Sequence, residues 1–316
     1  MAPKTHPVRI ALTMGDPFGI GPEVALAALR DTTAEVTVYG DPALFPGVAR
    51  IVPVAIEGER PAKPGPSAAG GRAALRALDL ALADLKAGTQ GALVTAPVSK
   101  ESLALAEGPA DGHTPYLGRA FGVLDPLMAF VWDDAEPVVA LLTTHIPLRA
   151  VPSSLTGAKV ERAVRRLHEA LVTRFRRQEA RIGVLGLNPH AGEQGLLGTE
   201  EEDFIAPALD RLRAEGLHVT GPLPGDAAFA VRREYDAILA MYHDQGLGPV
   251  KALAFDRAVN VTLGLPVIRT SPAHGTAFGI AGTHAADPSS MKAALRWAER
   301  LTRAPVAGTR MGFPSP

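Results

Sequence analysis

The chain of 316 residues contains no cysteine. This absence excludes disulfides, a thiolate nucleophile, and zinc or iron–sulfur sites held by cysteine. The chain also has almost no net charge, because 32 Lys and Arg residues balance 33 Asp and Glu residues. It therefore lacks the basic excess with which proteins bind nucleic acids or anionic membrane surfaces.

Long apolar runs are absent as well. No segment approaches the roughly 18 uncharged apolar residues that a membrane-spanning helix needs, and the N-terminal residues lack the pattern of a secretory signal. We therefore expect a cytoplasmic protein with no nucleic-acid partner and no membrane partner. The G-x-G-x-x-G dinucleotide pattern, the G-x-x-x-x-G-K-[ST] phosphate loop and the G-x-S-x-G nucleophile elbow are also missing.

Apolar strand-like segments alternate with amphipathic helical segments along the chain. The strand-like segments are rich in Val, Ile, Leu and Ala without polar alternation, which is typical of parallel strands covered on both faces. They lie at 8–14, 35–41, 91–100, 128–134, 138–145, 181–190, 235–244 and 259–272, and the helices at 72–88, 157–178, 199–216 and 287–303. The pattern predicts an α/β fold with a mainly parallel sheet and helices on both faces. We also expect 128–134 and 138–145 to pair as neighbours.

Three histidines stand where an apolar run meets a polar turn: His145 in VVALLTTHIPLR, His190 in IGVLGLNPHAGEQG and His243 in ILAMYHDQGLGPVK. A single histidine in such a place is more often a structural, hydrogen-bonded residue than a ligand. Ligands of open α/β sheets, however, gather beyond the carboxyl ends of the strands. Imidazole is the commonest transition-metal ligand, and a three-histidine site leaves positions open for a substrate. The three together therefore predict a metal site.

The stretch from 243 to 276 contains residues that could hold an anion. Lys251, Asn260 and Arg269 lie near predicted strand ends and suit a phosphate or a carboxylate, although two surface cations would look the same. The segment GHTPYLG (112–118) contains His113 and Thr114 and is expected to be a loop.

Three turns complete the candidate positions. In GDPFGIGPEV (15–24), Asp16 and Glu23 suit either polar contacts in a cleft or simple capping. The small residues of AHGTAFGIAG (273–282) let backbone approach a ligand closely, or merely pack the loop. GPLPGD (221–226) is expected to be a turn with Asp226 exposed.

Taken in order, these segments resemble the 4-hydroxythreonine-4-phosphate dehydrogenase family, and the likeness extends over almost the whole chain. The resemblance implies that His145, His190 and His243 bind a divalent metal (zinc, magnesium or cobalt) with ligands drawn from both subunits of a homodimer. It also implies contacts to a small phosphorylated hydroxy-amino-acid substrate from five residues: His113, Thr114, Lys251, Asn260 and Arg269. Asp226 matches an aspartate of the same cleft, and catalytic roles fall to His113, Lys251 and Asp226, with the general acid or base left open.

The wider relatives are isocitrate- and isopropylmalate-type dehydrogenases. They imply a two-lobed fold with mainly parallel sheets and an active site in the cleft between the lobes. The expected lobes are an outer one, residues 1–112 plus 275–316, and a central one, residues 113–274, with the metal site and the dimer interface. Their HGxA loop holds the adenine side of NAD, so the resemblance assigns NAD or NADP to His274, Gly275, Thr276, Ala277 and Gly282.

The implied reaction is the metal- and NAD(P)-dependent oxidation of 4-(phosphooxy)-L-threonine. The 3-keto acid that forms would decarboxylate to 3-amino-2-oxopropyl phosphate on the way to pyridoxine 5′-phosphate. One alternative keeps the chemistry and changes the substrate, to threonate 4-phosphate or a cyclic diol. A second is a cofactor-free metal hydrolase or lyase, and a third is a non-catalytic metal-binding scaffold.

Overall fold

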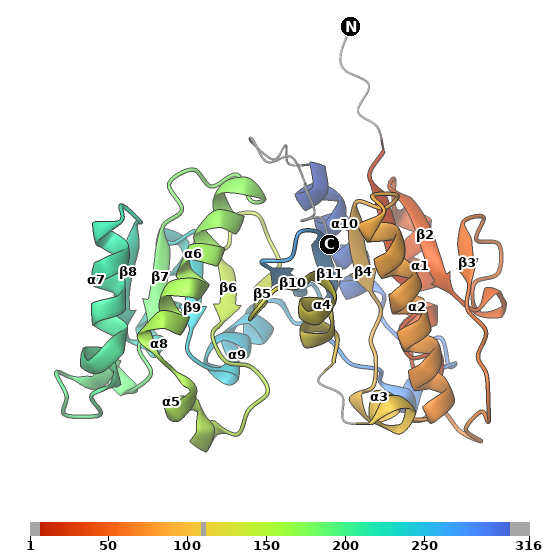
Figure 1. Cartoon of the computed structure of the whole chain (residues 1–316), viewed down its shortest axis with the longest axis horizontal. Coiled ribbons are helices and arrows are strands. Elements are labelled where there is room, and N and C mark those ends of the chain that lie inside the picture. Colours follow the sequence, from red (N-terminus) through yellow and green to blue (C-terminus); the bar gives the residue numbers. More distant parts are fainter. Residues whose placement is uncertain (1–6, 109–111, 304–316) are drawn as a thin grey trace, which may run out of the picture. The chain divides into compact units, whose positions relative to one another are not determined.

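The computed structural model describes residues 7–108 and 112–303, which form two compact units (Figure 1). The first unit contains the chain up to Pro126 together with Val259–Arg303, and the second contains Leu127–Ala258. These limits differ from the expected lobe boundaries after residues 112 and 274. The difference has a physical cause, because the segments between the two sets of limits are bonded into the first unit. Tyr116 donates a hydrogen bond to Asp79, and residues 268–270 pair with the strand at 92–94.

The described part of the first unit contains six strands, in the order β3-β2-β1-β4-β11-β10. Its strands are β1 (Arg9–Thr13), β2 (Glu35–Gly40), β3 (Ile51–Pro53), β4 (Ala92–Thr95), β10 (Val259–Leu263) and β11 (Ile268–Pro272). All neighbours are parallel except β10, which runs antiparallel to β11. The central strands β1 and β4 are almost entirely buried, as expected for a sheet covered on both faces.

Five α-helices belong to this unit: α1 (Gly21–Ala28), α2 (Ala68–Lys86), α3 (Lys100–Glu107), α4 (His113–Phe121) and α10 (Ser289–Arg303). Figure 1 draws α2 in front of the strands, where it contacts β1, β2 and β4. Helix α10 contacts β4, β10, β11 and α1. The N-terminus of α2 is capped by Ser67, whose hydroxyl accepts a hydrogen bond from the Gly70 amide at 3.0 Å.

The described part of the second unit contains five strands, in the order β5-β6-β9-β7-β8. Its strands are β5 (Leu127–Val131), β6 (Val138–Leu141), β7 (Ile182–Leu185), β8 (Val219–Leu223) and β9 (Ala237–Ala240). Strands β5 and β6 are antiparallel neighbours, which confirms the expected pairing, and the remaining pairs are parallel. The helices are α5 (Val151–Ser154), α6 (Gly157–Thr173), α7 (Ala206–Ala214), α8 (Gly225–Ala228) and α9 (His243–Ala254).

The predicted fold class, a mainly parallel α/β protein, is confirmed, but two local predictions were wrong. GHTPYLG is not a loop, because residues 113–121 form α4. GPLPGD is not merely a turn, because β8 continues to Leu223 and α8 follows at once. Across the described ranges, no helix is long and apolar enough to cross a membrane.

Candidate active site

Arg269 is a buried cation in the middle of the first unit. It lies on β11 and is 3% exposed. Its guanidinium donates hydrogen bonds to Thr262 Oγ1 on β10 at 3.1 Å and to Thr95 Oγ1 on β4 at 2.7 Å. Its Nε is buried and meets no acceptor among the described residues. Burial lowers the pKa of Arg269 to about 10, so the group is still charged near neutral pH. A buried cation that meets only hydroxyls is prepared for an anion.

His113 and Thr114 begin α4, after Gly112 with φ of 89°. Burial, and secondly the positive charge of Arg269, lower the pKa of His113 to about 3. His113 is therefore neutral near pH 7 and offers hydrogen bonds rather than charge. A group with so low a pKa is also a poor general base at that pH. On the neighbouring strand β10, Asn260 Oδ1 is buried and has no hydrogen-bond partner among the described residues.

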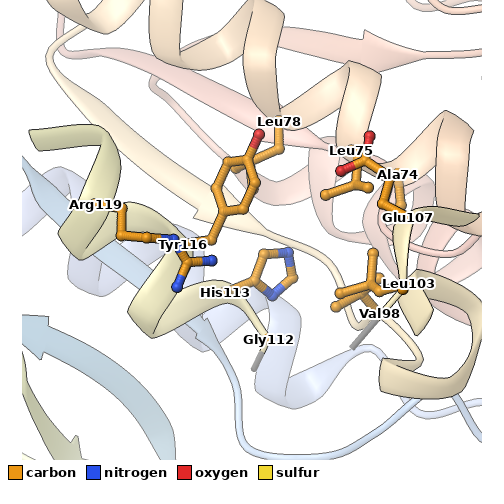
Figure 2. Close-up of a pocket in the computed structure, with 11 residues that line it drawn as sticks. Ala74, Leu75, Leu78, Val98, Leu103, Glu107, Gly112, His113, Tyr116 and Arg119 are labelled. Carbon is orange, nitrogen blue, oxygen red and sulfur yellow. The ribbon is translucent and has the colours of Figure 1, made fainter. Parts of the chain in front are cut away.

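A pocket opens beside His113 between α2, α3 and α4 (Figure 2). Figure 2 shows the His113 ring between Tyr116 on one side and Leu103 and Val98 on the other. Tyr116 and Arg119 line the same pocket, and both escaped the sequence analysis. They stand three and six positions after His113 on one helix, so a helical reading of GHTPYLG would have placed all three on one side of it.

The opening turn and the 273–282 loop lie against each other. The Ile20 amide donates to Thr276 O at 2.9 Å, and the Gly282 amide donates to Glu23 Oε2 at 3.2 Å. His274 Nε2 is buried without a hydrogen-bond partner among the described residues. The loop predicted to bind NAD is thus joined to the start of α1 and contains an unsatisfied polar atom.

Asp16, in the opening turn, is a buried carboxyl group. Its oxygens accept hydrogen bonds from the Ser102 hydroxyl at 2.5 Å and the Phe18 amide at 3.1 Å. Burial raises the pKa of Asp16 above its ordinary value, and the two hydrogen bonds partly offset that effect. Asp16 does not cap α1, whose N-cap is Ile20, and both of these hydrogen bonds lie within the first unit.

His145 and His243 come together beyond the carboxyl ends of the neighbouring parallel strands β6 and β9. His145 follows β6, and His243 begins α9 directly after β9. The centroids of the two imidazole rings are 5.4 Å apart. His243 Nδ1 lies 2.7 Å from Asp244 Oδ1, an arrangement that orients the ring and leaves Nε2 for a ligand.

His190 does not join that pair. It lies in the loop after β7, where Nδ1 is 3.0 Å from Glu193 Oε1 and the side chain is 61% exposed. Glu193 raises the pKa of His190 above its ordinary value, chiefly through this hydrogen bond. Within the described part of one chain, no group of three or more His, Asp and Glu side chains is placed to hold a metal ion.

Lys251 and Asp226 are both exposed residues of the second unit. Lys251 lies on α9, with its Nζ 5.7 Å from the centre of the Phe255 ring. Asp226 is on α8, and its negative charge adds to the upward shift of the pKa of His190. The Asp226 carboxylate therefore acts electrostatically on His190, which lies in the loop after β7.

The mainly parallel sheet and its helices define an α/β protein, with a buried arginine on β11 and histidines beyond the ends of β6, β7 and β9. Its architecture is shared with a β-decarboxylating dehydrogenase from Thermococcus kodakarensis, at 17% identity and a TM-score of 0.50 over 89% of this chain and 80% of that chain. At that identity the likeness shows the fold alone. The family model described as pyridoxal phosphate biosynthetic protein PdxA matches residues 24–298, and the chain belongs to that family.

Individual relatives agree with the family. A 4-hydroxythreonine-4-phosphate dehydrogenase from Thioalkalivibrio sulfidiphilus is 43% identical over 93% of this chain and 97% of its own length. The crystal structure of the enzyme of that name from Klebsiella pneumoniae has a TM-score of 0.84 and 35% identity, covering 95% of this chain and 99% of that one. A terephthalate 1,2-cis-dihydrodiol dehydrogenase from Burkholderia xenovorans is 29% identical, with a TM-score of 0.66 over 93% of this chain and 98% of that one.

Proposed function

We propose that the protein oxidises 4-(phosphooxy)-L-threonine with NAD or NADP, as the names of its relatives suggest. The observation that carries this proposal is Arg269. Among the described residues, its buried guanidinium donates only to threonine hydroxyls and its Nε has no acceptor, so it is suited to the phosphate of a phosphorylated substrate. A substrate without an anionic group would leave this buried charge uncompensated.

His113, Thr114 and Asn260, which belong to the same unit as Arg269, are proposed to orient the substrate. His113 is neutral because of burial and the nearby guanidinium, so it can hydrogen-bond a substrate oxygen without adding charge. Asn260 offers an unpaired Oδ1 to a substrate donor. Thr114, in the first turn of α4, and Lys251, exposed on α9, are proposed to add further contacts. Holding the substrate at several points fixes its reacting carbon in one orientation.

His145, His190 and His243 are proposed to hold a divalent metal. The donor set fits, because two imidazoles already lie side by side and two of the three Nδ1 atoms contact carboxylates, which leaves Nε2 available. A divalent metal, when bound, stabilises the negative charge that develops on a substrate oxygen during the oxidation. Asp226, whose charge acts on His190, is proposed to support the same site.

We propose that two copies of the chain complete this metal site as a homodimer. The described residues of one chain bring together only His145 and His243. Each of the three histidines is also followed within its own segment by exposed apolar side chains, the kind of surface that a partner covers. These are Ile146 and Leu148 after His145, Leu196 and Leu197 after His190, and Leu253 and Phe255 after His243.

The loop at 273–282 is proposed to bind NAD or NADP through His274, Gly275, Thr276, Ala277 and Gly282. Its support is the buried unpaired Nε2 of His274 and the fixed backbone around Thr276. The nicotinamide of such a cofactor accepts a hydride. A cytoplasmic location stays a prediction from the sequence.

The test is a comparison of substrates under one set of conditions. Purified protein with Zn²⁺, Mg²⁺ or Co²⁺ and NAD or NADP is given 4-(phosphooxy)-L-threonine, threonate 4-phosphate or terephthalate cis-dihydrodiol, and reduced cofactor is followed at its absorbance band. We expect the highest kcat/KM with 4-(phosphooxy)-L-threonine. A higher kcat/KM with threonate 4-phosphate or the diol would contradict the proposed substrate. Failure to bind NAD and NADP at equilibrium would instead favour a cofactor-free hydrolase or lyase.

A further inference from the structure

The loop that carries His190 has an exceptional backbone. Six consecutive residues, from His190 to Gly195, have φ between 44° and 85°. His190, Ala191, Glu193 and Gln194 all carry a Cβ, which makes this left-handed conformation unfavourable. Such a conformation persists only where the surroundings hold it in place.

The buried side chain of Glu201 holds the start of this loop. Glu201 is 3% exposed and opens η5 (Glu201–Ile205), a single π-helical turn. Its Oε1 accepts hydrogen bonds from the amides of Leu187 at 2.7 Å and Asn188 at 2.8 Å, and its Oε2 accepts one from Asn188 Nδ2 at 2.9 Å. An ionised carboxylate offers only acceptors, so it matches this set of three N–H donors.

Two glycines let the Glu201 carboxylate reach the backbone on both sides of His190. A Cβ at Gly186 would lie 2.9 Å from Glu201 Oε1, and a Cβ at Gly192 would lie 2.7 Å from Oε2. Both distances are shorter than a van der Waals contact, so any side chain at either position would displace the carboxylate. The sequence therefore leaves space for this carboxylate next to the loop.

Asn188 connects Glu201 to His190, because it bonds to Glu201 and precedes His190 by two residues. Asn188 is fixed at its amide and at its side chain, and its carbonyl accepts a hydrogen bond from the Ala191 amide at 3.1 Å. His190 thus lies between Asn188 and Ala191, which are joined by a backbone hydrogen bond, while its own ring is exposed. We propose that Glu201 is a positioning residue that holds His190 in place for the metal. This inference rests on the proposed metal site.

The experiment measures the affinity of the full-length protein for Zn²⁺ alone, by titration of metal-free protein against a competing chelator. Glu201→Gln replaces an acceptor oxygen with an NH₂ group that would face an N–H donor. We expect Zn²⁺ to bind about 10–100-fold more weakly, the usual effect of losing a group that orients a metal ligand. Glu202→Gln is the matched control, because Glu202 is the exposed next residue, and it should bind Zn²⁺ like the wild type.

A double variant separates positioning from a general loss of structure. If Glu201 acts through His190, Glu201→Gln should change the residual Zn²⁺ affinity by less than about twofold in a His190→Ala background. Equal weakening in both backgrounds, or wild-type affinity of Glu201→Gln, would overturn the assignment. Wild-type affinity of His190→Ala would overturn the metal site itself, and the role of Glu201 with it.

A milder variant covers the case in which Glu201→Gln does not fold. Asn188→Ala removes the side-chain hydrogen bonds from Asn188 Nδ2 to Glu201 Oε2 and to Glu200 Oε2, and leaves the two backbone bonds to Glu201 intact. We expect this variant to fold and to bind Zn²⁺ more weakly than the wild type by about 3–10-fold. Unchanged Zn²⁺ affinity of Asn188→Ala would then contradict the proposal.

Discussion

The candidate site residues of the two units differ in their exposure to solvent. In the first unit, Arg269 is buried on a strand and hydrogen-bonded to the strands on either side. In the second unit, His145 and His190 lie on exposed loops, with apolar side chains such as Leu196, 81% exposed, close by in sequence. Arg269 is thus held in place within one chain, whereas the exposed imidazoles beside apolar side chains are what the proposed site completed by a second chain requires.

The largest expected effect comes from the histidine pair. His243→Ala removes a proposed metal ligand and should lower kcat/KM by at least about 1000-fold, because metal stabilisation of developing charge contributes several kcal/mol. His168→Ala, a partly exposed histidine on α6, is the control and should keep wild-type activity. Substantial activity of His243→Ala would show that the second unit supplies no essential ligand.

The second-largest effect is expected for substitutions of Arg269, the buried cation of the first unit. Arg269→Met should raise the KM for a phosphorylated substrate by about 100-fold, since hydrogen bonds to a charged group contribute about 1.5–3 kcal/mol each. Arg269→Lys keeps the charge but loses the guanidinium fork, so a smaller rise is expected. Arg50→Met, at an exposed ion pair of the same unit, should leave KM unchanged. An unchanged KM in Arg269→Met would remove the main support for a phosphate site.

Lys251 offers a direct contrast with Arg269. Lys251 is exposed, so its contact with a substrate anion is screened by solvent and easily replaced by water. Lys251→Met should therefore raise KM by about tenfold at most at physiological ionic strength. Steady-state kinetics with both variants in one buffer provide the measurement. A larger effect for Lys251→Met than for Arg269→Met would reverse the ranking by burial.

The smallest effect concerns stability and pH. The pKa of His113 is lowered to about 3 in the folded chain, below its ordinary value of about 6.5. The unfolded chain therefore binds more protons between these two values, so His113 makes stability fall as pH drops from about 6.5 towards 3. His113→Gln removes this titration, so the loss of stability between pH 7 and pH 5 should be smaller by up to about 2 kcal/mol. Denaturant unfolding at pH 7 and pH 5 would show it, and identical pH dependence in both proteins would contradict the pKa shift.

The strands were predictable because burial on both faces requires continuous apolar residues, as in β4 and β9. Helix α4 was not, because His113 and Thr114 stand next to Gly112 in a segment without strong periodicity. In the structure Gly112 precedes the helix, and Pro115 stands in its first turn, where the missing N–H costs nothing. The helical spacing of His113 and Tyr116 was hidden for that reason.

The site was predictable in its residue types but not in its arrangement. Strand ends indicated where the histidines would gather, yet the position of His190 depends on a left-handed loop that no residue pattern specifies. Glu201 was equally hidden, because it stands among the acidic residues of TEEED and only burial distinguishes it from Glu202.

The central claim, a metal site completed by two copies of the chain, is tested most directly by heterodimers of inactive variants. Chains with different affinity tags are coexpressed and the mixed dimers purified. A His145→Ala/His190→Ala heterodimer should regain about half of the wild-type activity, because one of its two sites receives all three histidines. A His145→Ala/His243→Ala heterodimer should stay inactive, because these two ligands come from the same chain. No recovery in the first heterodimer would contradict a shared site.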